Sequence, residues 1–341
     1  MIAITGGGTG GHLAIARALG RELNLRGLKA IFIGSSSGQD RMWFEDSDIF
    51  EACYFLDSSG VVNRRGFGKV LSLVNILNLA FKCKHIFDTH GIKMIISVGG
   101  YSAAPAAIGA IIYNKRLYIH EQNAIIGRLN LLLKPFAKGF FSSYFKPKFD
   151  YPVDDRFFKI ARIRQDFKVI LFLGGSQGAN FINTLALNLA PNLAQNGIKI
   201  IHQCGQKEYD AMIRKYQELN IEAEVFAFSK DIEHYMNRAD FCISRAGAST
   251  IWELCAAGLP TIFIPFPYAA NNHQFYNAKF LCDQGAGMIV SQDELNLDSV
   301  KEMIYSANLK EISQKLLNLI DKNGSKIIIN EILKNCKKTY T

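Results

Sequence analysis

The sequence predicts an α/β protein of two similarly built domains, each organised around a parallel sheet. Its 341 residues are too many for one ordinary hydrophobic core and suit two domains of roughly 150 to 190 residues. Apolar residues make up 49% of the chain and charged residues 20%, which excludes disordered and collagen-like classes. A short apolar run, a glycine loop and a helical pattern follow one another at residues 2–25 and again from residue 169, about 170 residues later.

The first glycine loop, GGGTGGH at residues 6–12, joins a predicted strand to a predicted helix. Backbone N–H groups at such a loop, together with the positive end of the helix dipole, form a cradle for pyrophosphate. The spacing also fits a dinucleotide fingerprint, but the next strand, at residues 30–34, has no clear acidic residue at its end to bind a ribose. His12 either caps the helix or lies beside a reacting group.

An apolar run with flanking cations follows, and residues 61–87 contain no carboxylate. A helix over residues 70–81 would be apolar around more of its circumference than a core-facing stripe requires. It is either a well-buried crossover helix or a face that enters an anionic membrane surface. Charge favours the membrane, because residues 1–150 hold 18 Lys and Arg against 10 Asp and Glu, and the remainder holds 21 against 20. The predicted patch comprises Arg64, Arg65, Lys69, Leu73, Leu77, Phe81, Lys82 and Lys84.

Several classes of protein are disfavoured by composition. The seven cysteines include no C-x-x-C pair, so we expect neither a disulfide framework nor a zinc site, but a cytoplasmic protein. The first residues do not predict a secretion signal. Residues 94–114 are uncharged, yet Gly99, Gly100 and Pro105 interrupt them, so we expect a strand, a loop and a buried helix instead of a membrane span. No nucleic-acid motif is present.

Two further loops follow predicted strands, GGYSAAP at residues 99–105 and HEQNAIIGRLN at residues 120–130. Glu121 and Asn123 stand at a strand's carboxyl end, which faces the ligand crevice in an open parallel sheet. Residues 142–158 lose hydrophobic periodicity and carry two prolines, as a linker does. We therefore place a first domain at residues 1–150 and a second at 151–324, with a terminal helix, about residues 325–341, that can return onto the first domain.

Residues 241–278 concentrate groups that suit a nucleotide sugar. A strand at 241–244 leads through a glycine loop to a helix that ends near Gly258, and such a helix start binds phosphate. Arg245 either adds charge there or pairs structurally. Glu253, one turn after Thr250, either accepts both ribose hydroxyls or complements the helix dipole as a first-turn acid. Asn271, Asn272, His273 and Gln274 follow the next strand and offer uncharged polar groups to a sugar.

The order of these residues resembles the donor-binding signature of the MurG family. The signature reads Arg245-x-Gly247-Ala248-x-Thr250, Glu253, AGLP at 257–260, Pro265-Phe266 and His273-Gln274-x-x-Asn277-Ala278. GGGTGGH, GGYSAAP, HEQN and GGSQGA at 174–179 also look like motifs of this family. Ala103 and Ile126 stand where serine and proline are expected, and YPVD at 151–154 replaces Asn-Pro-Val-Arg, with the nearest arginine at 156.

The resemblance implies the GT-B fold, in which two Rossmann-like parallel-sheet domains face each other across a cleft. It implies inverting transfer of N-acetylglucosamine (GlcNAc) from UDP-GlcNAc to the 4-hydroxyl of MurNAc in lipid I, undecaprenyl-diphospho-MurNAc-pentapeptide. The products would be lipid II and UDP in peptidoglycan biosynthesis. His12 would be the general base, with Asn123 and Glu253 also at the reacting centre. Neither a cofactor nor a metal is implied, and no Asp-x-Asp pair is placed to hold a metal.

The resemblance also implies binding residues and partners. Serine 176 of GGSQGA would contact donor phosphate, although a serine there can equally cap a helix. The implied partners are UDP-GlcNAc, lipid I, the cytoplasmic face of an anionic bacterial inner membrane, to which the protein would bind peripherally, and other proteins of cell-wall synthesis, with no nucleic acid. The implied donor-binding residues are Thr9, Gly10, Gly11, Asn123, Ser176, Gln177, Ser229, Arg245, Ala248, Ser249, Thr250, Glu253, His273 and Gln274, and the acceptor-diphosphate residues are Gly7, Gly8, Thr9, Gly10, Gly99, Gly100 and Tyr101.

Other functions remain open from the residues themselves. Another GT-B lipid glycosyltransferase or a UDP-GlcNAc epimerase shares the fold, and the acceptor distinguishes them. A nicotinamide-dependent oxidoreductase requires the first glycine loop to bind a dinucleotide, against which the missing ribose acid argues. A non-catalytic sugar-nucleotide binder would bind UDP-GlcNAc without releasing UDP.

Overall fold

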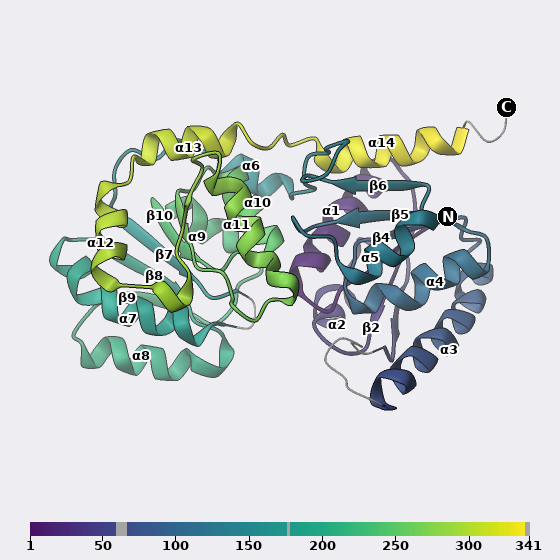
Figure 1. Ribbon diagram of the computed structural model, residues 1–341, viewed down its shortest axis with the longest axis horizontal. Helices are drawn as coiled ribbons and strands as arrows, with labels where there is room; N and C mark the ends of the chain where they lie inside the picture. Colours follow the sequence, from purple (N-terminus) through teal and green to yellow (C-terminus); the bar gives the residue numbers. More distant parts are fainter. Residues whose placement is uncertain (59–66, 176–177, 338–341) are drawn as a thin grey trace. The chain divides into compact units, whose positions relative to one another are not determined.

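The computed structural model contains two compact α/β units, each built on a six-stranded parallel sheet (Figure 1). Unit 1 comprises Met1–Asp154 and Asn323–Thr341, and unit 2 comprises Asp155–Lys322. The structure describes residues 1–58, 67–175 and 178–337. Of the predicted site residues, Arg64, Arg65, Ser176, Gln177 and the side chain of Lys69 lie outside the described residues. The predicted class, two Rossmann-like parallel-sheet domains, is confirmed.

The sheet of unit 1 has the strand order β3-β2-β1-β4-β5-β6. The order reverses between β1 and β4, so the crevice at their carboxyl ends is the topological switch point where open sheets bind ligands. The strands read as apolar runs because helices cover both faces of a parallel sheet. They are β1 Ile2–Thr5, β2 Ala30–Ser35, β3 Cys53–Leu56, β4 Met94–Ser97, β5 Arg116–Glu121 and β6 Gly139–Ser142.

The helices of unit 1 include the last helix of the chain, α14. It packs on α1, where Arg26 donates to Asn330 Oδ1 at 2.7 Å and to the Lys326 carbonyl at 3.1 Å. The uncharged stretch at 94–114 forms β4, a short 3₁₀ turn and α4, which confirms the predicted strand, loop and helix. The helices are α1 Gly10–Leu25, α2 Asp40–Phe44, α3 Phe67–Thr89, η1 Tyr101–Ala103, α4 Ala104–Ile112, α5 Arg128–Leu133, η2 Lys134–Phe136 and α14 Gly324–Lys337.

Helix α3 has one buried face and one exposed apolar face. The buried face packs on α4. The two helices lie so close together that a Cβ atom at Gly109 of α4 would be 3.0 Å from the Ala80 carbonyl oxygen of α3. The other face exposes six large apolar side chains by 46 to 56% each: Val70, Leu71, Leu73, Val74, Leu77 and Phe81. Among the described helices, α3 alone is long and apolar enough to cross a membrane, by length and composition. The exposed face is the apolar surplus that the sequence predicts.

The sheet of unit 2 has the strand order β12-β11-β10-β7-β8-β9 and reverses between β7 and β10. The predicted helix after β10 ends at Ala257, and Gly258 follows it in the left-handed conformation (φ 64°). The strands are β7 Val169–Leu173, β8 Lys199–Gln203, β9 Ala223–Phe226, β10 Phe241–Ser244, β11 Thr261–Phe263 and β12 Met288–Ile289. The helices are α6 Asp155–Lys159, α7 Asn180–Gln195, η3 Gln206–Glu208, α8 Tyr209–Glu218, α9 Ile232–Arg238, α10 Ala248–Ala257, η4 Ala270–Asn272, α11 His273–Cys282, η5 Gln292–Glu294, α12 Leu297–Ser306 and α13 Leu309–Leu317.

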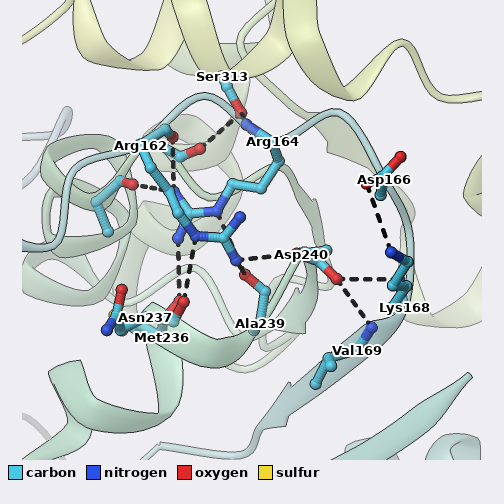
Figure 2. A network of polar contacts seen from close by, with 12 residues as sticks. Arg162, Arg164, Asp166, Lys168, Val169, Met236, Asn237, Ala239, Asp240 and Ser313 are labelled. Atoms are coloured by element: carbon cyan, nitrogen blue, oxygen red, sulfur yellow. Dashed lines mark hydrogen bonds and ion pairs between the residues drawn. The ribbon is translucent and has the colours of Figure 1, made fainter.

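A fully buried arginine, Arg164, ties the carboxyl ends of α9 and α10 together in unit 2 (Figure 2). Its guanidinium donates to the carbonyls of Met236, at 3.0 Å, of Ala239, at 3.3 Å, and of Ala257. Helix ends present such unpaired carbonyls together with the negative end of the dipole, which a cation satisfies. Burial lowers the pKa of Arg164 to about 9, so the group stays protonated at neutral pH.

Candidate functional site

In unit 1, a buried carboxylate holds the first glycine loop. Asp40 begins α2, and its side chain accepts hydrogen bonds from the Gly8 N–H at 2.6 Å and the Ser35 N–H at 2.8 Å. Burial raises the pKa of Asp40, and the hydrogen bonds from the backbone N–H groups of Ser35 and Gly8 oppose that rise. Asp40 therefore joins the loop after β1 to the end of β2.

The loops after β1, β2 and β4 meet at the carboxyl ends of these strands. They pack so closely that a side chain in place of several of their glycines would clash with a neighbouring loop. A Cβ at Gly8 (φ +81°) would lie 2.4 Å from the Tyr101 ring, and one at Gly100 (φ +81°) would lie 2.2 Å from the Gly7 carbonyl. The Tyr101 hydroxyl donates to the Ser37 carbonyl at 3.1 Å. Tyr101 thus spans the predicted acceptor loops after β1 and β4, and the loop after β2.

The N–H groups of Gly7 and Gly8 already have partners within unit 1. Gly7 donates to the Gly99 carbonyl at 3.2 Å, and Gly8 donates to Asp40. An anion at this loop would therefore meet the start of α1, whose first turn, from Gly10, contains no acidic side chain. The N–H groups of Gly7 and Gly8 thus help to pack the loop, and the contact of these two glycines with the acceptor diphosphate stays a prediction.

His12 lies in the first turn of α1 with both ring nitrogens in contact with side chains. Nδ1 lies 3.0 Å from Thr9 Oγ1, and Nε2 lies 2.7 Å from Gln122 Nε2. A Cβ at Gly99 would lie 3.2 Å from the ring, so the glycine gives the imidazole room. The loops after β1, β4 and β5 thus meet at His12, and the sequence did not indicate its contact with Gln122.

A second histidine, His120, lies buried near His12. Its pKa is lowered to about 3, first by burial and then by the charge of His12. Its ring packs edge-on against Tyr151 with centroids 5.5 Å apart, and both of its nitrogens lack a hydrogen-bond partner among the described residues. His120 is therefore neutral at physiological pH.

The buried carboxylate of Glu121 organises the loop that carries Asn123. It accepts hydrogen bonds from the Asn123 N–H at 3.0 Å, the Gly127 N–H at 2.9 Å and Asn130 Nδ2 at 2.8 Å. These bonds fold residues 123–127 back over the end of β5. Glu121 is occupied with this structural task, while the side chain of Asn123 remains half-buried at the sheet edge.

In unit 2, the predicted phosphate-binding helix is α10. It begins at Ala248 after Gly247, with no acidic residue in its first turn. Glu253 is the sixth residue of the helix, so the alternative that it is a first-turn acid is wrong. Thr250 and Glu253 are half-buried on one side of α10, whereas Ser249 and Trp252 are buried.

Arg245 lies just before α10 and holds neighbouring loops. Its guanidinium donates to the carbonyls of Ile264 and Pro265, both at 3.1 Å, and to Gln292 Oε1 at 2.9 Å. The guanidinium carbon of Arg245 lies 5.5 Å from the centre of the Phe266 ring. Burial lowers the pKa of Arg245 to about 10. Arg245 therefore makes the structural pairing that the sequence left as one of two interpretations.

The polar loop after β11 is fixed by its own side chains. Gln274 Oε1 accepts from the Phe266 N–H at 2.9 Å, and His273 Nδ1 lies 2.8 Å from the Ala270 carbonyl. Asn271 and Asn272 both adopt positive φ, near 53°. Asparagine tolerates this left-handed conformation better than most residues, which explains the repeated amide at the turn.

The loop that carries the implied donor-binding residue Ser229 follows β9 in unit 2 and contacts Arg156. Ser229 Oγ accepts from the Asp231 N–H at 3.0 Å. Arg156 donates to the Lys230 carbonyl at 2.7 Å and pairs with Glu233 at 2.9 Å. In unit 1, Asp154 instead pairs with Arg17 at 3.6 Å and with Arg21. The arginine of the unusual linker thus supports the loop that carries Ser229.

Comparison with known proteins agrees with this arrangement. Residues 2–142 match the glycosyltransferase family 28 N-terminal domain, and residues 169–331 match the glycosyltransferase family 28 C-terminal domain. A relative from Campylobacter fetus subsp. fetus is 61% identical over 98% of this chain and 100% of its own length. It is named UDP-N-acetylglucosamine–N-acetylmuramyl-(pentapeptide) pyrophosphoryl-undecaprenol N-acetylglucosamine transferase. The chain belongs to the MurG family, within glycosyltransferase family 28.

Solved structures place the MurG fold on the whole chain. The crystal structure of Acinetobacter baumannii MurG superposes with a TM-score of 0.75 and 28% identity, over 98% of this chain and 99% of that one. A UDP-N-acetylglucosamine 2-epimerase superposes with a TM-score of 0.65 at 12% identity, over 99% of this chain and 96% of that one, which shows a shared fold alone. The two Rossmann-like domains of the predicted GT-B fold are confirmed, and the chain is a glycosyltransferase.

Three residues with structural roles near the predicted site residues have no signal in the sequence that indicates their contacts. Asp40 stands five residues beyond β2, too far from the strand end to be a typical ribose-binding acid, and it binds backbone N–H groups instead. Gln122 lies inside the recognised HEQN motif, but nothing in its spacing indicates contact with His12. Arg156 was noted only as the nearest arginine, and its contacts with residues 230–233 depend on the fold of unit 2.

Proposed function

We propose that this protein transfers GlcNAc from UDP-GlcNAc to the 4-hydroxyl of MurNAc in lipid I, with inversion, and releases lipid II and UDP. The observation that carries the proposal is full-length identity of 61% to a relative with that named activity. The test is UDP release from UDP-GlcNAc with and without lipid I. Acceptor-dependent release is expected, whereas release or sugar interconversion without lipid I, or no release at all, would refute the proposal.

In this proposal, unit 1 supplies the base and the contacts to the acceptor. His12 takes the proton of the attacking hydroxyl, as a histidine within hydrogen-bond reach of a substrate proton can do. The acceptor diphosphate lies at the start of α1, beside Thr9 and Gly10, where the first turn lacks acidic side chains. Asn123, which the Glu121 carboxylate holds at the end of β5, orients the acceptor or the sugar.

Unit 2 binds the donor. The start of α10, together with Ala248, Ser249 and the loop after β7, receives the diphosphate, and its N–H groups stabilise charge on the leaving UDP without a metal. Among the described residues, no three His, Cys, Asp or Glu side chains form a metal-binding group. The loop with Ser229 reads uracil, and His273 and Gln274 contact GlcNAc. Ser176 and Gln177 belong to the donor site by family resemblance.

Glu253→Ala is expected to raise the KM for UDP-GlcNAc by about 10-fold or more with a smaller change in kcat, because a charge-assisted ribose contact is lost. Steady-state kinetics with varied donor and saturating lipid I measure this. Glu302→Ala, which removes an exposed carboxylate from α12, is the matched control and should leave the KM unchanged. A donor KM for Glu253→Ala equal to that of the wild type would remove Glu253 from the ribose site.

We further propose that the exposed face of α3 binds the anionic cytoplasmic surface of the bacterial inner membrane, peripherally. The exposed apolar side chains lie beside Lys82 and Lys84, and Arg64, Arg65 and Lys69 lie close in sequence. The buried face of α3 belongs to the core of unit 1, which supports a peripheral position over a spanning one. Other proteins of cell-wall synthesis are further proposed partners.

Flotation with lipid vesicles tests the α3 face. The wild type should float with vesicles that contain anionic lipid, less in high salt, and the triple variant Leu73→Glu, Leu77→Glu, Phe81→Glu should lose about 10-fold or more of this binding. Leu219→Glu, at an exposed leucine of unit 2, is the control. Equal flotation of the triple variant, or flotation that ignores anionic lipid, would argue against the assignment.

A further inference from the structure

The two ring nitrogens of His12 contact side chains that differ in their exposure to solvent. Thr9, whose hydroxyl lies 3.0 Å from Nδ1, is exposed, whereas Gln122, whose amide lies 2.7 Å from Nε2, is only 7% exposed. A substrate hydroxyl can reach Nδ1 by displacing a surface hydroxyl. To reach Nε2 it would have to displace a buried amide, which costs an unpaired polar group.

We propose that Gln122 is a positioning residue for the base: it holds His12 through Nε2, so that Nδ1 takes the proton of the acceptor hydroxyl. This inference rests on the proposed role of His12 in the transfer. It assigns to a neutral amide the place that a carboxylate occupies in a catalytic triad, behind the imidazole and opposite the reacting nitrogen.

The proton that neutral His12 carries requires one of the two orientations of the Gln122 side-chain amide. Nδ1 can accept a proton only if neutral His12 carries its own proton on Nε2, and that N–H needs an acceptor, which is Gln122 Oε1. In the structure the amide nitrogen points to His12, and Oε1 is buried with no hydrogen-bond partner among the described residues. Rotation of the amide by half a turn gives this oxygen a partner and places the proton on Nε2.

The same orientation serves both protonation states of the ring. During transfer, the acceptor oxygen forms its bond to the anomeric carbon, its proton moves to Nδ1, and the bond to UDP breaks with its electron pair on the phosphate oxygen. The imidazolium then carries protons on both nitrogens, and Gln122 Oε1 still accepts from Nε2–H. The opposite orientation, with the amide nitrogen on Nε2, places the ring proton on Nδ1 and prevents it from acting as the base.

The pH dependence of variants tests the proposal. Gln122→Glu puts a carboxylate on Nε2–H and should move the acidic limb of the kcat/KM profile upward by about 1 to 2 pH units. Gln122→Met, of similar volume, should lower kcat by about 10- to 100-fold and leave the donor KM within about 2-fold, as loss of a residue that orients another does. Gln284→Glu, an exposed glutamine of unit 2, adds the same charge elsewhere and should leave the limb in place.

Nuclear magnetic resonance of ¹⁵N-labelled histidine gives a readout that needs no turnover. The His12 signal, identified by its loss in His12→Gln, should show the Nε2–H tautomer in the wild type and titrate at higher pH in Gln122→Glu. An Nδ1–H tautomer, or an unshifted titration together with an unshifted acidic limb, would overturn the proposal. Failure of the proposed function would instead appear as absent acceptor-dependent UDP release by the wild type.

Discussion

His12→Ala is expected to lower kcat for GlcNAc transfer by about 100-fold or more, because the attacking hydroxyl loses its general base. Donor binding should persist, since the residues assigned to UDP-GlcNAc in unit 2 are untouched. The measurements are kcat from lipid I-dependent UDP release and the Kd for UDP by calorimetry. Both values come from the same preparation, which separates loss of chemistry from loss of folding.

The control for this variant is another histidine of unit 1. His85 on α3 is exposed and far in sequence from the glycine loops, so His85→Ala removes the same side chain without touching the proposed base. Its kcat should equal that of the wild type. Turnover by His12→Ala within about 3-fold of the wild type would remove His12 from the mechanism, because general-base contributions are far larger than that.

The strands and their glycine loops could be predicted because both signals are local. An apolar run such as that of β10 must be buried, and a glycine such as Gly8 or Gly258 stands where the backbone turns into a conformation that side chains avoid. The exposed apolar face of α3 could also be predicted from a local signal, because the helix has more apolar residues than one core-facing stripe can hold.

Polar residues whose partners are distant in sequence could not be assigned this way. Asp40 bonds Gly8 across 32 residues, and Gln122 meets His12 across 110. Nothing in the sequence near either residue indicates which partner it will meet, because the fold alone brings these loops together. The position of Arg245 beside a predicted phosphate-binding helix allowed two interpretations. Its contacts with Ile264, Pro265 and Gln292 show the structural pairing, and its contact with the donor stays a prediction.

The site in unit 2 also depends on groups far from the donor loops. Helix α10 presents its start to the proposed phosphate site, while Arg164, from the coil before β7, donates to the carbonyl of its last residue, Ala257. The Arg164 N–H donates to Ser313 on α13 at 3.1 Å, and Ser313 donates to the Gly258 carbonyl at 2.8 Å. The orientation of α10 is therefore fixed from behind by a buried cation and one hydroxyl.

Replacement of Arg164 by methionine should destabilise unit 2 by about 3 to 5 kcal/mol. Methionine fills much of the volume but leaves the Met236 carbonyl buried without a donor. The carbonyls of Ala239 and Ala257 keep only Arg162, at 2.8 Å and 3.4 Å, and lose their hydrogen bonds to Arg164. Each lost bond to the charged group costs about 1 to 3 kcal/mol, in part offset by relaxation. Urea unfolding measures the change. The chain has 2 tryptophans, so in a Trp43→Phe background Trp252 of α10 reports on unit 2 alone.

A second arginine of unit 2 separates this effect from simple loss of charge. Arg238 forms an exposed pair with Glu224, and Arg238→Met should change the unfolding free energy by less than about 1 kcal/mol, as surface pairs do. Arg164→Lys keeps the charge but lacks the planar fork that reaches several carbonyls at once, so its loss should lie between the two. If Arg164→Met unfolds at the same urea concentration as Arg238→Met, the carbonyls find other donors, and α10 does not depend on Arg164.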